Sequence, residues 1–125
     1  MLTFTVEQMR VLQEKIGDPI LLRQLRVHFA KFDPVWMGSA PEAEMDRRLI
    51  VGIARARRWD IQTFEGIGVF ICGMQSAPRF DEHLAFRAVL SNPALDETGK
   101  IDGICAPGLL RHWRAARDIG LEWEG

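Results

Sequence analysis

Residues 39–58 read SAPEAEMDRRLIVGIARARR, and this stretch decides the fold class of the chain. Ser39 is followed three residues later by Glu42, with Pro41 between them, which is typical of the start of an α-helix. Apolar residues then recur at helical spacing, at Met45, Leu49, Ile53 and Ala56. The sequence therefore predicts an amphipathic helix that runs to about Arg58. Its opposite, solvent-facing side carries Arg47, Arg48, Arg55 and Arg58.

Start and stop signals divide the rest of the chain into further helices. We expect them from Thr5 to about Ile16, from Pro19 to Phe32, from Thr63 to Gln75 and from Asp81 to Leu90. A last helix between Asp96 and Asp118 should be broken near Pro107. The buried stripe of the second helix is Ile20, Leu21, Leu25, Phe29 and Phe32, and that of the last is Leu109, Leu110, Trp113 and Ala116. The segment from Asp33 to Ala40, around Trp36, predicts a loop.

The run from Ile67 to Met74 is ambiguous, because β-branched and aromatic residues in a short apolar stretch also describe a buried strand. Thr63 can cap a helix, and the run from there to Gln75 has a length typical of a helix. Gly66 and Gly73 then lie seven residues apart on one face, where a neighbouring helix can approach closely. Because glycine costs a helix up to about 1 kcal/mol relative to alanine, we expect both to have a packing reason.

Length and composition predict one all-α domain over residues 1–125, a single compact bundle of about six helices. The formal net charge of -1 provides neither a basic field for nucleic acid nor an acidic tail. The most apolar stretch is about half the roughly 20 residues that a membrane helix needs. No secretory leader is recognisable, so we expect a cytoplasmic protein with Cys72 and Cys105 reduced.

No residue pattern indicates catalysis, a cofactor or a metal ion. His28, His83 and His112 have no metal-site spacing with the two cysteines, and we interpret them as structural or solvent-exposed. Cys72 lies in the most apolar run and should be a buried, inert thiol. The carboxylates of Asp81 and Glu82 fit an exposed helix start. The glycines between Gly66 and Gly73 lack the pattern of a phosphate-binding loop.

Arginines gather on the helix that ends near Arg58 and again near the end of the chain, at Arg111, Arg114 and Arg117. A nucleic-acid-binding protein would use such a patch on phosphates. Acidic residues are interleaved with these arginines, however, and an arginine-covered solvent face is common on helices. Nucleic acid is therefore an unlikely partner.

The span from about Arg47 to Asp102 carries a resemblance to a known group of proteins. It contains RRLIVGIARARRWDI, then an apolar helix followed by Phe80-Asp81, then LAFRAVLSNPAL with Lys100-Ile101-Asp102 close behind. In this order the chain resembles the small helical proteins encoded beside VgrG, PAAR and toxin genes in bacterial type VI secretion clusters. The start FTVEQMRVL is also similar to theirs. The glycine-rich fourth helix and Pro107 depart from that pattern.

The resemblance implies an accessory role, as co-chaperone or loading adaptor for a secreted toxin or its PAAR/VgrG carrier. An immunity protein that blocks a cognate toxin is the alternative, and a small enzyme is a weaker one. For the partner-binding surface we predict Trp36 and Trp123, because tryptophan is enriched at interface hot spots, together with Arg48 and Arg55. The competing interpretation is that each tryptophan caps the core.

Overall fold

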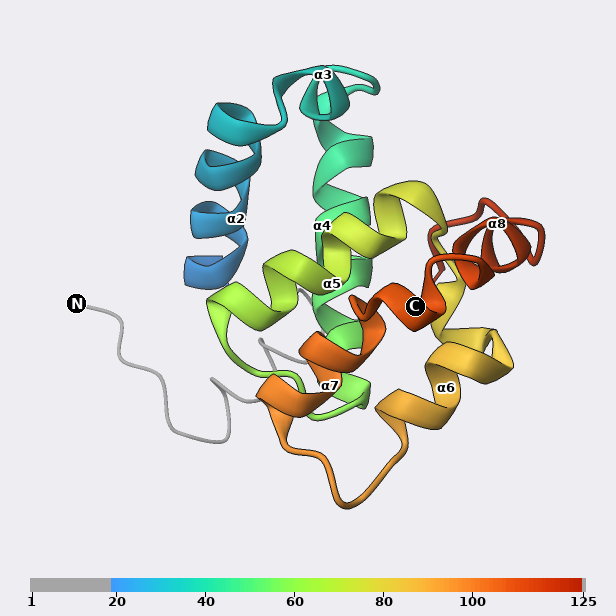
Figure 1. The fold of residues 1–125 in the computed structure, drawn as a ribbon. Helices are drawn as coiled ribbons and strands as arrows, with labels where there is room; N and C mark the ends of the chain where they lie inside the picture. Colours follow the sequence, from blue (N-terminus) through green and yellow to red (C-terminus); the bar gives the residue numbers. More distant parts are fainter. Residues whose placement is uncertain (1–18, 125) are drawn as a thin grey trace. The chain divides into compact units, whose positions relative to one another are not determined.

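The computed structural model describes residues 19–124, and within them every regular element is helical (Figure 1). The helices are α2 (Pro19–Phe32), α3 (Pro34–Met37), α4 (Glu42–Arg58), α5 (Phe64–Ser76), α6 (Leu84–Leu90), α7 (Glu97–Ile104) and α8 (His112–Arg117). Two 3₁₀ turns, η1 (Phe80–Glu82) and η2 (Pro107–Leu109), complete the described part. The all-α prediction is therefore confirmed, and the run from Ile67 to Met74 is helical. The helix expected from Thr5 to Ile16 lies outside the described residues.

The chain divides into two compact units at Ile50 and Val51, within α4. Unit 1 contains α2, α3 and the first half of α4, and unit 2 contains the second half of α4 and all later elements. One domain over residues 1–125 stays a prediction.

Unit 1 has a small core in which α2 contributes Leu21, Leu25 and Phe29, all buried. Ile20 and Phe32, predicted to share this stripe, are exposed. Ile20 is turned about 100° from its neighbour Leu21, because each helical residue rotates by that angle. Phe32 is the last residue of α2, where its ring contacts the ring of His28 at 4.9 Å. The predicted stripe was therefore too wide.

The predicted loop from Asp33 to Ala40 instead contains the short helix α3. Pro34 occupies its first turn, where a missing N–H costs no helical hydrogen bond. The ring of Trp36 meets Phe29 edge-on at 5.3 Å between centroids. The hydroxyl of Ser39 donates to the carbonyl of Trp36 at 2.5 Å, and α4 begins three residues later at Glu42.

Helix α4 follows its prediction closely, from Glu42 to Arg58. The four residues expected to face inward, Met45, Leu49, Ile53 and Ala56, are all buried. In the first turn, the carboxylate of Glu44 accepts hydrogen bonds from Arg47 and Arg48. These bonds, first that of Arg47, lower the pKa of Glu44 to about 2.

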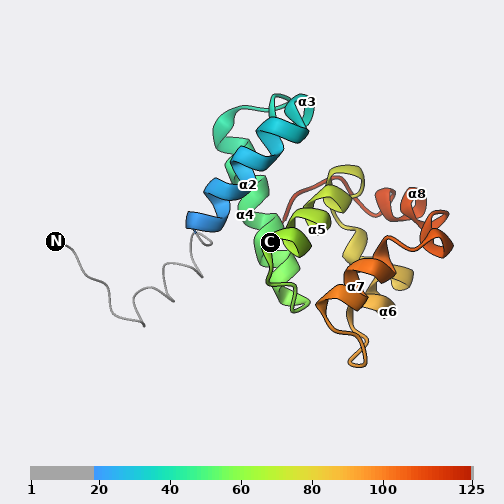
Figure 2. The ribbon, with the colours of Figure 1, turned by 60° about the vertical axis from the view of Figure 1, so that its left-hand side comes forward.

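Unit 2 is built around α5, which lies beside α7 in both views (Figure 1 and Figure 2). The hydroxyl of Thr63 accepts from the N–H of Gly66 and so caps α5, as predicted. Phe70 of α5, Phe80 of η1 and Phe86 of α6 form an aromatic core with centroid distances of 4.8 and 5.4 Å. Trp113 of α8 closes it, 4.4 Å from Phe86.

The last third of the chain departs from its prediction at one helix start and at one residue expected to be buried. The helix expected from Asp81 begins at Leu84, because η1 comes first and the Nδ1 atom of His83 then caps α6 by accepting from the N–H of Ala85. The predicted break near Pro107 is confirmed, since η2 separates α7 from α8. Leu110, predicted to be buried, is exposed because it lies in the turn before α8.

Gly73 lies in close contact with another side chain, as predicted from its position inside a helix. Replacing Gly73 with alanine tests this packing. A Cβ atom there would lie 2.8 Å from the Trp113 ring and 3.2 Å from Phe80, which hold each other in the aromatic core. We expect Gly73→Ala to lower the free energy of unfolding by about 1–3 kcal/mol.

The matched control is Gly68→Ala in the same helix, where the added Cβ atom meets open space. That change should raise stability by up to about 1 kcal/mol through helix propensity. The free energy of unfolding of both variants is measured by urea denaturation. Equal changes in the two variants would contradict the packing of Trp113 on Gly73.

Candidate functional site

Charged side chains line a hollow of about 310 Å³ in unit 2, which we call the arginine pocket. Its lining consists of Arg55, Arg58 and Trp59 from the end of α4, Arg79, Asp81 and Glu82 around η1, Arg87 of α6, and Glu124 of the C-terminal tail. Four arginines thus converge with three carboxylates at one place.

A buried ion pair forms the floor of the arginine pocket. Arg55 is 4% exposed and Asp81 is 2% exposed, and the guanidinium donates to both carboxylate oxygens, with Nε lying 3.1 Å from Oδ2. The indole Nε1 of Trp59 donates to the same Oδ2 at 3.0 Å. Arg55 Nη1 also donates to the backbone carbonyl of Glu124 at 2.9 Å. Because both charges are paired and hydrogen-bonded, this arrangement offsets the cost of burying them.

The end of α4 places Trp59 at this floor. Asp60 adopts a left-handed conformation with a φ of 62°. Aspartate is one of the few residues besides glycine that tolerate this conformation. The N–H of Ile61 then donates to the carbonyl of Ala56, which satisfies the last turn of the helix. Lys100 of α7 donates to the carbonyl of Trp59 at 2.8 Å. The turn after α4 is thereby held from two sides.

The rim of the arginine pocket contains one paired arginine and two that have no partner within residues 19–124. Arg79 donates to both carboxylate oxygens of Glu82, with Nη2 lying 3.0 Å from Oε1. This bond lowers the pKa of Glu82 and raises the pKa of Arg79. The guanidinium groups of Arg58 and Arg87 are exposed and make no hydrogen bond or ion pair with any residue that the structure describes.

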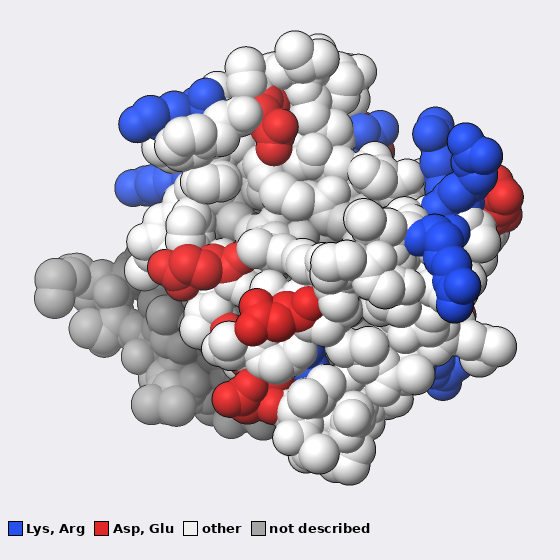
Figure 3. Space-filling view, in the orientation of Figure 1, with Lys and Arg blue, Asp and Glu red and all other residues white. Residues whose placement is uncertain are grey.

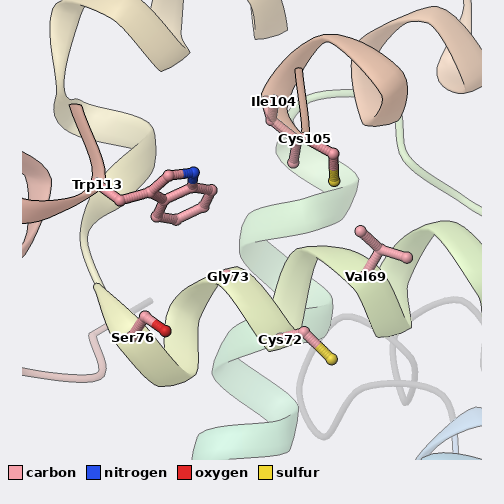
Figure 4. A pocket seen from close by; sticks show the side chains of 7 residues that line it. All are labelled: Val69, Cys72, Gly73, Ser76, Ile104, Cys105 and Trp113. Atoms are coloured by element: carbon pink, nitrogen blue, oxygen red, sulfur yellow. The ribbon is translucent and has the colours of Figure 1, made fainter. Parts of the chain in front are cut away.

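A second hollow, of about 320 Å³, lies between α5, α7 and α8 (Figure 4). It is mainly apolar and is lined by Val69, Cys72, Gly73, Ser76, Ile104, Cys105 and Trp113. Figure 4 shows Cys72 on α5 and Cys105 directly after α7, with thiols that are not directed at each other, and the two do not form a disulfide. Burial raises the pKa of the Cys105 thiol, and the charge of Asp102 raises it further, so a thiolate is disfavoured there.

Cys72 corrects the prediction of a buried thiol, since its residue is exposed. It follows the fully buried Ile71, and the turn of about 100° between them carries Cys72 out of the core. The reduced state of both cysteines stays a prediction.

Helix α8 presents a surface of exposed apolar and basic residues. We define the α8 surface by Leu110, Arg111, Arg114, Arg117, Ile119 and Leu121, all exposed. Leu110, which precedes α8 in the chain, is 67% exposed, and Leu121, which follows it, is 60% exposed. Figure 3 shows basic side chains gathered where α8 lies in Figure 1. Large apolar groups beside arginines are typical of protein interfaces.

The four predicted partner-binding residues are not brought together in one site. Trp123 is 5% exposed and Arg55 forms the floor of the arginine pocket, so the expectation that both are surface residues is wrong. Trp36 is half-buried against Phe29, and Arg48 is half-buried beside Glu44. Burial of Trp123 favours the interpretation that it caps the core. Whether any of the four binds a partner stays a prediction.

Sequence reasoning missed the arginine pocket. Asp81, expected at an exposed helix start, is buried because Arg55 approaches it from a helix 26 residues earlier in the chain. The pair Phe80-Asp81 carries part of the resemblance, but no local pattern predicted that both residues are buried.

The histidines form no recognisable catalytic arrangement. The rings of His83 and His112 lie 5.3 Å apart, and His83 already caps α6 through Nδ1. His28 packs edge-on against Phe29 in unit 1, with centroids 5.3 Å apart. Across residues 19–124, no group of three or more histidine, cysteine or acidic side chains is placed to hold a metal ion.

Comparisons with known proteins do not identify the chain, which matches no protein-family model, no curated protein and no solved structure. Within the described part of the chain, no helix combines the length and apolar character needed to cross a lipid bilayer.

The floor of the arginine pocket predicts a large effect for Asp81→Asn. This variant leaves the buried Arg55 guanidinium with only the more distant carboxylate of Glu82, 3.7 Å away, which should cost up to about 3–5 kcal/mol of the free energy of unfolding. Denaturant unfolding followed by tryptophan fluorescence measures the loss.

Two variants serve as controls for Asp81→Asn. Glu44→Gln removes the carboxylate of a partly exposed surface ion pair and should lower the free energy of unfolding only slightly. Replacing both charges, as Arg55→Met with Asp81→Leu, should cost less than Asp81→Asn alone, because no unpaired charge remains. A loss no greater than that of Glu44→Gln would contradict the buried ion pair.

Proposed function

We propose that this chain is a cytoplasmic protein-binding accessory factor, a co-chaperone or loading adaptor for a type VI secretion toxin or its PAAR/VgrG carrier. The observation that supports protein binding is the α8 surface, where Leu110 and Leu121 are exposed to solvent in a segment that also contains three exposed arginines. The secretion context rests on the sequence resemblance between Arg47 and Asp102.

The physical argument is the free energy that covering this surface would release. Fully burying a leucine side chain contributes about 1.5–3 kcal/mol, and Leu110 and Leu121 both retain most of their exposure. Arginine is enriched at interfaces because its planar group pairs with carboxylates and stacks on flat side chains. A partner that covers α8 with an apolar patch and acidic residues would satisfy both features.

Phosphate contacts are a weaker explanation of the same arginines. Binding of nucleic acid depends on many lysine and arginine contacts along the backbone. The α8 surface supplies three arginines, on a chain whose net charge is -1. Exposed leucines contribute nothing to such contacts, whereas they contribute directly to a protein interface.

Capture of the partner tests this proposal. The tagged protein, and a variant carrying Leu110→Asp with Leu121→Asp, are used to recover partners from the cells that encode them, followed by mass spectrometry. We expect the unaltered protein to recover a toxin or a PAAR/VgrG carrier and the variant to recover at least tenfold less.

Leu84→Asp is the matched control, because Leu84 is 82% exposed in unit 2 but lies outside the α8 surface. It should leave capture unchanged. Recovery that is equal for all three proteins, or recovery of nucleic acid alone, would contradict the proposal. A captured toxin whose activity is abolished by binding would assign the immunity role instead.

A further inference from the structure

The arginine pocket contains guanidinium donors that form no hydrogen bond or ion pair with the other described residues. Asp81 accepts two hydrogen bonds from Arg55 and one from Trp59, and Glu82 is held by Arg79. Arg58 and Arg87 line the same hollow from α4 and α6, and neither has a partner among the described residues. Guanidinium groups bind carboxylates in a bidentate manner, which makes these two arginines a ready pair of donors.

We propose that the arginine pocket binds a carboxylate side chain from an acidic segment of a partner protein, through Arg58 and Arg87. This inference rests on the proposed protein-binding function and names the chemistry of the partner. It concerns a site different from the α8 surface.

The charge of the pocket favours a group with a single negative charge. Four arginines and three carboxylates line the pocket, an excess of one positive charge, of which Glu122, outside the lining and 3.8 Å from Arg79, offsets a part. A carboxylate matches that excess, whereas a doubly charged phosphate would leave the pocket negative. Glu82 and Glu124 line the same hollow and would repel the second charge. The volume of about 310 Å³ also fits a side chain better than a nucleotide, because ligand sites begin near this size.

The C-terminal tail shows that this region already accommodates an irregular acidic segment. The carbonyl of Glu124 accepts from Arg55, and Glu122 lies 3.8 Å from the guanidinium of Arg79. Between them, Trp123 is buried. The pocket wall therefore holds a glutamate–tryptophan–glutamate sequence by backbone and charge contacts. A second acidic segment would meet the remaining donors beside it.

Nuclear magnetic resonance titration of the full chain tests the proposal with a defined probe. The probe is the peptide acetyl-Gly-Glu-Leu-Glu-Gly-amide, and the signals followed are the Nε–Hε groups of Arg58 and Arg87 and the indole N–H of Trp59. We expect saturable shifts of all three. Arg58→Gln with Arg87→Gln should weaken binding about tenfold or more, because charge-assisted hydrogen bonds are lost.

Three comparisons make the result decisive. The glutamine analogue of the peptide and inorganic phosphate should both bind more weakly than the glutamate peptide. Arg23→Gln with Lys31→Gln removes the same amount of charge from exposed positions of α2, outside both the arginine pocket and the α8 surface, and should leave the titration unchanged. Equal binding of the glutamine peptide, equal or tighter binding of phosphate, or an equal loss in the α2 variant would overturn the carboxylate site.

The outcome is separable from that of the capture experiment. A chain that recovers its partner but shows no saturable shift with the glutamate peptide retains the protein-binding function and loses the carboxylate site. A chain that binds the peptide through Arg58 and Arg87 but recovers no partner keeps the site and loses the proposed function.

Discussion

The ion pair between Arg55 and Asp81 is the interaction on which the arginine pocket depends. It connects the second half of α4 with the turn η1, and through a carbonyl of Glu124 it also holds the C-terminal tail. Burying one charge alone would cost several kcal/mol, so each residue requires the other. The pair fixes Trp59 by the same carboxylate.

Helical structure was predictable because its signals are local. The start near Pro41, the spacing of Met45 and Leu49, and the cap at Thr63 all involve residues within one or two turns of each other. Gly73 was predictable for a related reason, since a glycine inside a helix costs stability unless another side chain needs the space. Trp113 is the side chain that occupies it.

The candidate sites were not predictable, because they depend on contacts between residues distant in sequence. A charged residue on an amphipathic helix is normally predicted to face solvent. Arg55 is buried instead because it pairs with Asp81, which lies 26 residues later in the sequence. Trp123 likewise is buried in a tail that has no helical periodicity. The exposure of Leu110 follows from where the chain turns after η2, which no apolar pattern reveals.

The most direct measurement is the exchange of the guanidinium Nε–Hε proton of Arg55 with solvent in the intact protein. A buried, doubly bonded guanidinium predicts a resolved signal whose exchange is slow compared with that of exposed arginines such as Arg114. An Arg55 signal that coincides with those of the exposed arginines and exchanges as fast as they do would contradict the ion pair.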